Sequence, residues 1–238
     1  MGDLRPVPEA RDRIGWASGD DSWLSEAFAE YASGIFVDEF QGRKRFGRQL
    51  EEWRRQALNS DREAPIAAAD TLRGPNAFRQ RTDLLYNKGP YVLHMLRIQL
   101  DDRKYMEVMR ALQERFRHHS ISTEQLLVEV SRAAGQNYTS FFDQWIWDVG
   151  IPKFTYSRRA EEQADGRYLI TVHVRQEDRE RVKRVLMPVH IHFGNETTTQ
   201  YQPVVEGDQM IRILSPAEPK DVTLDDDRTL LAEFVKER

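Results

Sequence analysis

The sequence predicts an α+β protein with a helical part followed by a small antiparallel β-sandwich, and three observations support this fold class. Apolar residues recur every three or four positions from about residue 20 to 148, which is the period of helices with one buried face. After Pro152 apolar and polar residues alternate, which is the period of strands. The two patterns follow one another and do not interleave, so we expect two packed units, residues 1–152 and 153–238.

The helical part contains apolar stripes separated by breaks in the pattern. The stripes are Leu24, Ala27, Phe28, Tyr31 and Ile35, then Phe46, Leu50, Trp53 and Ala57, then Tyr105, Val108, Met109, Leu112 and Phe116, and finally Phe141, Phe142, Trp145 and Ile146. Asp20 and Asp21 are suited to cap the first stripe, and Lys88 to Leu96 continue the helical pattern between the second stripe and the third.

The segments between these stripes carry their own signals. Residues 1–13 contain prolines and scattered charge and are predicted to be irregular. Residues 59–83 are predicted to form a long loop, of the kind that often borders a functional cleft. Ser122 and Gln125 have the spacing of a capping box, which predicts a helix start. The run Gly150-Ile151-Pro152 ends the helical part.

The second part is predicted to consist of short strands. Tyr168, Ile170, Val172 and Val174 alternate with polar residues, as do Val189, Ile191 and Phe193, and further strands are expected near 199–205, 209–214, 220–224 and 230–235. The charged run 177–183 is predicted to be a solvated hairpin end.

The composition is typical of a globular protein and disfavours several classes of function. The chain has 238 residues, of which 39% are hydrophobic and 31% charged, and its formal net charge is −4. This charge gives no reason to expect nucleic-acid binding. No apolar run approaches the roughly 18 residues of a membrane span. The absence of cysteine excludes disulfides, cysteine-ligated metals and thiol nucleophiles.

Three ordered segments carry a resemblance to a known family. They are Trp23-Leu24-Ser25-Glu26-Ala27-Phe28-Ala29-Glu30-Tyr31, then Tyr86-Asn87-Lys88-Gly89, then Phe141-Phe142-Asp143-Gln144-Trp145 followed by Gly150-Ile151-Pro152. Together they resemble the M1 family of zinc aminopeptidases, which includes membrane alanyl aminopeptidases and leukotriene A4 hydrolase. The resemblance covers about residues 14–238. It implies the helical half of a thermolysin-like catalytic domain, followed by the β-sandwich found after that domain in many members.

The resemblance also implies roles for three residues. Glu26 matches the glutamate that is the third zinc ligand, and zinc takes a carboxylate beside two imidazoles. Tyr86 matches the tyrosine that stabilises the oxyanion of the peptide carbonyl. Glu30 lies one helical turn after Glu26 and is a candidate partner for a zinc-bound histidine. Without the resemblance, Glu26 would be interpreted as a solvated helix residue, Tyr86 as a half-buried aromatic and Glu30 as a member of a surface ion pair.

The sequence departs from the family where the remaining ligands should lie. The family's His-Glu-x-x-His motif would fall on residues 3–7, which are Asp-Leu-Arg-Pro-Val, and the motif occurs nowhere in the chain. The Gly-x-Met-Glu-Asn segment that holds the substrate's amino group is also missing. Ser25 and Ala27 stand where the family usually has Asn and Gly. Zinc is the cofactor of the full-length family, but we expect none bound at Glu26 in this chain alone.

Three hypotheses about function therefore stay open. The first is a fragment or truncated member of a zinc metallopeptidase that removes N-terminal residues from peptides, inactive without an N-terminal half or a partner that carries the motif. The second is a non-catalytic M1-like scaffold that acts as a protein-interaction module. The third is a truncated gene product with no role of its own.

The histidines are the remaining candidates for chemistry. His190 and His192 lie two apart on an expected strand and so face the same way, which favours an exposed polar face over a metal site. His94 lies among apolar helix residues and is expected to be packed. His118 and His119 follow a helical stripe, where positive charge suits a helix C-terminus.

Overall fold

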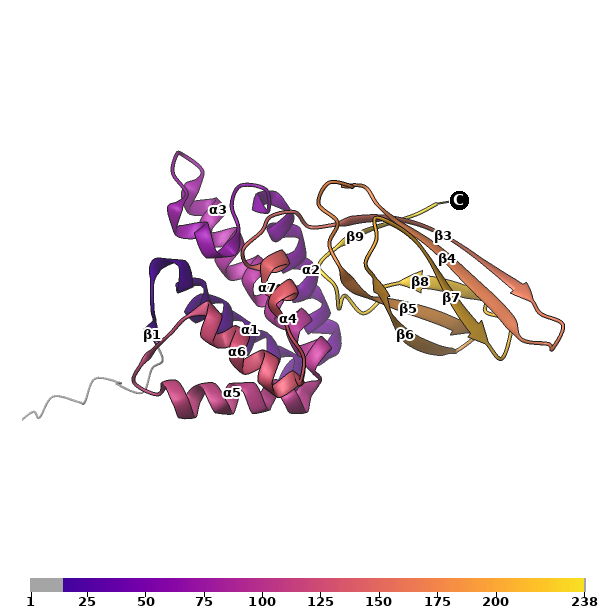
Figure 1. The fold of residues 1–238 in the computed structure, drawn as a ribbon, viewed down its shortest axis with the longest axis horizontal. Coiled ribbons are helices and arrows are strands. Elements are labelled where there is room, and N and C mark those ends of the chain that lie inside the picture. Colours follow the sequence, from indigo (N-terminus) through magenta and orange to yellow (C-terminus); the bar gives the residue numbers. More distant parts are fainter. Residues whose placement is uncertain (1–14, 238) are drawn as a thin grey trace, which may run out of the picture. The chain divides into compact units, whose positions relative to one another are not determined.

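A computed structural model describes residues 15–237 (Figure 1). The expected irregular segment 1–13 and the motif position 3–7 lie outside the described residues. The chain divides into two compact units. One comprises Met1–Ser33 and Glu63–Asp148, and the other Gly34–Arg62 and Val149–Arg238. The expected domain boundary after residue 152 stays a prediction.

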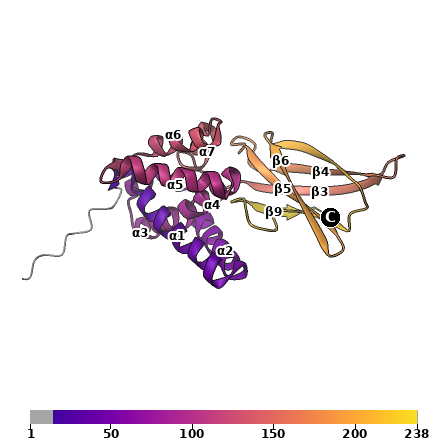
Figure 2. The same ribbon diagram turned by 90° about the horizontal axis from the view of Figure 1, so that it is seen from below.

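The helical segments are η1 (Gly19–Asp21), α1 (Trp23–Gln41), α2 (Arg43–Ser60), η2 (Ile66–Thr71), α3 (Ala77–Asp83), η3 (Leu84–Lys88), α4 (Gly89–Leu100), α5 (Asp102–Phe116), α6 (Thr123–Ala134) and α7 (Thr139–Trp145). The stripe from Phe46 to Ala57 lies on the buried face of α2. Phe141, Phe142 and Trp145 are buried as expected. Helix α5 contacts both α4 and α6 (Figure 2).

Two details of the helical segments test the sequence signals. Both hydrogen bonds of the capping box between Ser122 and Gln125 are present at the start of α6, which confirms that prediction. The expected loop 59–83 is wrong, because most of this segment is helical, in the end of α2, in η2 and in α3. The two later segments are only one to two turns long, too short to display a 3.6-residue period in the sequence.

The strands of the second part are β3 (Lys153–Glu162), β4 (Tyr168–Gln176), β5 (Val185–Phe193), β6 (Glu196–Val204), β7 (Asp208–Ser215), β8 (Asp221–Leu224) and β9 (Glu233–Lys236). They form one sheet in the order β7-β4-β3-β9 and another in the order β6-β5-β8. The expected alternation is present in β4, where Ile170, Val172 and Val174 are buried. The fold class, a helical part followed by a β part, is confirmed; the packing of the two sheets as a sandwich stays a prediction.

Two features of the β part differ from expectation. Strand β9 pairs parallel to β3, so the sheets are not wholly antiparallel. The run 177–183 is not a hairpin end, because β4 and β5 belong to different sheets. The side chain of Lys183 is buried, and its main-chain N–H and C=O both bond the amide of Gln176. Lys183 therefore lies in a charged run of the sequence but is a buried residue that fixes the connection between the two sheets.

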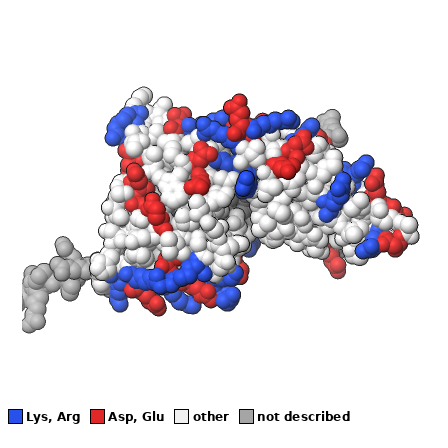
Figure 3. Space-filling view, in the orientation of Figure 1, with Lys and Arg blue, Asp and Glu red and all other residues white. Residues whose placement is uncertain are grey.

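The surface carries charges of both signs. Lys and Arg side chains are interspersed with Asp and Glu on the face seen in Figure 3. Within residues 15–237, no helix combines the length and the apolar character that crossing a lipid bilayer requires.

Candidate functional site

The start of α1, which carries Glu26, is fixed by a buried polar network. Asp21 Oδ1 accepts hydrogen bonds from the main-chain N–H of Thr123 at 2.7 Å and from its hydroxyl at 2.8 Å. The indole N–H of Trp23 donates to the same hydroxyl at 3.0 Å. The sequence predicted that Asp21 caps α1. Asp21 instead joins the start of α1 to the first turn of α6. Glu26 lies one turn into the helix that this network holds.

Tyr86 lies in the π-helical turn η3 between α3 and α4. A π-turn accommodates one extra residue in the helix, and such turns are frequent at functional sites. Leu84 and Leu85 are fully buried beside Tyr86, which is itself half-buried. The turn is thus anchored by apolar packing, while Tyr86 keeps part of its surface accessible to solvent.

The structure brings Tyr86 and Glu26 together. The Tyr86 hydroxyl donates a hydrogen bond to the Glu26 carboxylate, and this bond, burial and the negative charges of Glu26 and Glu30 raise the pKa of Tyr86. Arg81 acts in the opposite direction and lowers it. The three residues singled out from the sequence therefore form one local cluster. Their roles as zinc ligand, oxyanion donor and supporting carboxylate stay predictions.

Further polar side chains that the sequence did not indicate lie near this cluster. The Ser22 hydroxyl donates to Asp70 Oδ2 at 2.5 Å, and Arg81 forms an ion pair with Asp70. Burial raises the pKa of Asp70, but the bonds from Ser22 and Arg81 outweigh it and hold that pKa below its ordinary range. Asp70 and Arg81 lie in the segment expected to be a loop, and no short motif marks them.

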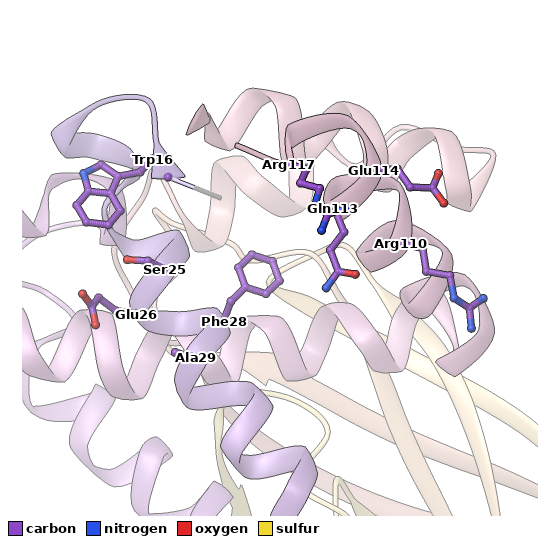
Figure 4. Close-up of a pocket in the computed structure, with 10 residues that line it drawn as sticks. Trp16, Ser25, Glu26, Phe28, Ala29, Arg110, Gln113, Glu114 and Arg117 are labelled. Atoms are coloured by element: carbon purple, nitrogen blue, oxygen red, sulfur yellow. The ribbon is translucent and has the colours of Figure 1, made fainter. Parts of the chain in front are cut away.

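A groove of about 1390 Å³ lies beside Glu26 (Figure 4). One wall comes from α1, with Ser25, Glu26, Phe28 and Ala29, and the other from α5, with Arg110, Gln113, Glu114 and Arg117. Trp16 closes one end from β1 (Gly15–Trp16), which pairs in parallel with β2 (Ser120–Ile121). The indole of Trp16 is half exposed there. The groove is open, and its walls offer apolar surface and charges of both signs.

The described residues do not make a zinc site by themselves. Catalytic zinc takes three protein ligands and leaves a fourth position for water. Within residues 15–237, no group of three or more His, Asp or Glu side chains is placed to hold a metal ion. Glu26 offers one carboxylate, which Tyr86 already engages. The observed donor set therefore does not fit the zinc that the family resemblance implies.

The histidines lie elsewhere, and one expectation about them is wrong. His190 does not lie on an exposed face: it is buried, and its Nδ1 lies 2.9 Å from the Thr199 hydroxyl on β6. His192 bonds Thr197 and Thr223 of the flanking strands. His94 is buried in α4, with Nδ1 3.2 Å from the Tyr31 hydroxyl, as expected for a packed histidine.

Comparisons with known proteins identify the family and the fold of this chain. Residues 12–145, more than half of the chain, match the Peptidase family M1 domain. Over 143 residues the chain is 28% identical to Aminopeptidase N of Lactococcus lactis subsp. lactis, covering 56% of this chain and 16% of that protein. The fold matches a crystal structure of Legionella pneumophila aminopeptidase A in complex with aspartic acid, with a TM-score of 0.73 and 14% identity, over 95% of this chain and 25% of that one.

The chain thus spans about a sixth of the length of the curated relative and a quarter of the solved structure. The sequence-based assignment is confirmed by the match to the family domain, which includes both Glu26 and Tyr86. This chain belongs to peptidase family M1.

Proposed function

We propose that this chain provides the carboxylate and phenol side of an M1 aminopeptidase active site, and that sequence carrying His-Glu-x-x-His provides the other side. The observation that supports this most is the pairing of Glu26 with Tyr86 across two helices. The proposed reaction is removal of the N-terminal residue of a peptide. Zinc would serve in it only with the ligands that the described residues lack.

The proposal gives Tyr86 a defined task. Like an ordinary tyrosine, Tyr86, whose pKa is raised further, is protonated at neutral pH and is a hydrogen-bond donor. A donor aimed at a developing oxyanion contributes roughly 2.7–4 kcal/mol to transition-state stabilisation in other hydrolases. In this chain the phenol donates to Glu26. Engagement of the Glu26 carboxylate by another partner would release the phenol for a substrate oxygen.

The groove between α1 and α5 is the surface proposed to receive the missing half. It borders Glu26 directly, and its wall exposes Trp16, Phe28 and Ala29. The relatives matched here are several times longer than this chain. A half-domain that covered this groove would bury the apolar wall and place further side chains beside Glu26.

The test is reconstitution with the missing half. The chain is produced with upstream sequence, or together with a partner chain, that contains His-Glu-x-x-His, and hydrolysis of aminoacyl-arylamides is measured with zinc present. We expect turnover that Glu26→Ala abolishes. Tyr86→Phe should lower kcat by about 10²–10³-fold with little change in KM. A reconstituted, zinc-loaded protein without turnover would reject the proposal.

A second candidate is a non-catalytic M1 scaffold that binds a partner protein. The absence of His-Glu-x-x-His from all 238 residues and the open groove favour it. The DNA upstream of the Met1 codon separates the two candidates. A His-Glu-x-x-His encoded there, in frame or after a frameshift, favours the peptidase fragment. Its absence, combined with a stable complex that Trp16→Ala weakens, favours the scaffold; a strictly monomeric chain counts against it.

A further inference from the structure

We infer that the contact of Gly89 with Ala27 sets the distance between α4 and α1, and that Gly89 is thereby a positioning residue for Tyr86 against Glu26. The catalytic meaning of this positioning rests on the function proposed above; the contact itself does not. Gly89 is the first residue of α4 and directly follows the π-turn that carries Tyr86. Ala27 directly follows Glu26 on α1.

Space, and not backbone conformation, requires glycine at this position. Gly89 has helical dihedral angles, with φ −54° and ψ −58°, which any residue adopts. A Cβ atom at position 89, however, would lie 2.8 Å from Ala27 Cβ. Carbon atoms in van der Waals contact lie roughly 3.5–4.0 Å apart. The methyl group of Ala27 has no torsion that could move it away, so a side chain at position 89 must push the helices apart.

The close packing around the contact transmits this displacement to Tyr86 and Glu26. Ala27, Pro90 and Tyr91 are buried, and so are Leu84 and Leu85, which directly precede Tyr86. Close-packed interiors transmit strain and do not absorb it locally. A shift at the contact therefore changes the separation of Tyr86, three residues before Gly89, from Glu26, one residue before Ala27. The hydrogen bond between phenol and carboxylate depends on that separation.

The contact also predicts its own compensation. Without the Ala27 methyl, the nearest atoms to a Cβ at position 89 are Leu84 O at 3.5 Å and Ala27 Cα at 3.8 Å, which are ordinary contacts. Exchanging the two residues, Ala27→Gly with Gly89→Ala, moves one methyl group from α1 to α4 and keeps the volume of the contact. The exchange also leaves the number of helical glycines unchanged.

The experiment observes the Tyr86 ring in the isolated chain by NMR of 13Cζ-labelled tyrosine at neutral pH, with the signal assigned through Tyr86→Phe. Glu26→Gln is the positive control: it removes the carboxylate beside the phenol and should shift the Tyr86 resonance. We expect Gly89→Ala to shift this resonance as well, and Ala27→Gly/Gly89→Ala to restore its wild-type position. Gly47→Ala is the matched control and should leave the resonance unchanged, because no atom lies within 4 Å of a Cβ at that position.

The outcomes separate cleanly. A wild-type Tyr86 resonance in a folded Gly89→Ala variant would overturn the inference. If Gly89→Ala does not fold, recovery of both folding and the wild-type resonance in the double variant supports the inference, and failure of the double variant overturns it. No outcome uses enzymatic activity. The expected resonances beside an inactive reconstituted enzyme would therefore reject the proposed function and leave the positioning contact intact.

Discussion

At the start of α1, one buried hydroxyl joins two other side chains. The Thr123 hydroxyl donates to Asp21 and accepts from the Trp23 indole, and all three side chains are nearly inaccessible. A buried polar group that loses its partner costs roughly 1–3 kcal/mol, because it gave up its hydrogen bonds to water on folding. This network holds the helix that carries Glu26.

We expect Thr123→Val, which keeps the side-chain shape, to lower the free energy of unfolding by about 1–3 kcal/mol in urea denaturation. The matched control is Thr82→Val, which removes an exposed hydroxyl bonded to Phe78 O at 2.9 Å and should stay within about 0.5 kcal/mol of wild type. Equal effects of the two substitutions would contradict the network.

In the β part, Asp225 gives a second prediction at the residue scale. Its carboxylate is buried and accepts bonds from the N–H of Thr229 at 2.7 Å and of Leu230 at 3.2 Å. Burial raises the pKa of Asp225 to about 7, against the lowering effect of these bonds. An unfolded aspartate titrates near about 3.9, so folding takes up a proton between about pH 4 and 7. Stability from this group is thus full at low pH and falls as pH rises.

We expect the free energy of unfolding of wild type to fall between pH 5 and 7.5 relative to that of Asp225→Asn, by roughly 2–3 kcal/mol from the linkage of this shift. Urea denaturation of both proteins across this range measures the difference, in which contributions common to both proteins cancel. A difference that stays constant, or that grows in the opposite direction, would show that Asp225 is ionised in the folded protein.

At the scale of elements, the glycines of the neighbouring helices α1 and α2 have different structural roles. Gly34 in α1 lies where a Cβ would come within 2.6 Å of the Trp53 ring and 3.1 Å of the Phe46 ring, and both rings are buried on α2. Gly47 in α2 has no atom within 4 Å of that position. The first glycine permits a close helix contact, whereas the second only adds flexibility to a helix interior.

We therefore expect Gly34→Ala and Gly47→Ala to change stability with opposite signs. Gly34→Ala should destabilise by about 1–3 kcal/mol through overpacking. Gly47→Ala should stabilise by roughly 0.5–1 kcal/mol, because alanine loses less backbone entropy in a helix. Thermal unfolding followed by circular dichroism compares them, and stabilisation by both would refute the close contact at Gly34.

At the scale of the whole molecule, Glu26 is a single carboxylate without the further ligands that a zinc site needs. Every described residue was available to join Glu26, and no group of three metal-ligating side chains forms in this part of the chain. We expect the purified chain to bind no stoichiometric zinc at Glu26 and to hydrolyse no aminoacyl-arylamide. Elemental analysis checks the first point. One zinc per chain that Glu26→Ala removes would overturn the assignment of this chain as half of a site.

Much of the architecture could be predicted from the sequence because periodicity reports directly on burial. The stripe on α2, the alternation in β4 and the capping box of α6 are local patterns, and each produces the element that it predicts. The resemblance predicts Glu26 and Tyr86 as site residues from three short motifs. Short helices escaped detection, as did the parallel pairing of β9, because neither leaves a periodic signal long enough to recognise.

The sequence by itself determined that a helical part precedes a β part, and it determined the family. Only the tertiary structure decided that Tyr86 donates to Glu26, that Arg81 and Asp70 stand beside them, and that His190 is buried. The physical reason is that the two kinds of interaction act over different separations along the chain. Periodicity and capping act between residues a few positions apart, whereas a hydrogen bond across two helices depends on how closely Gly89 lets those helices approach.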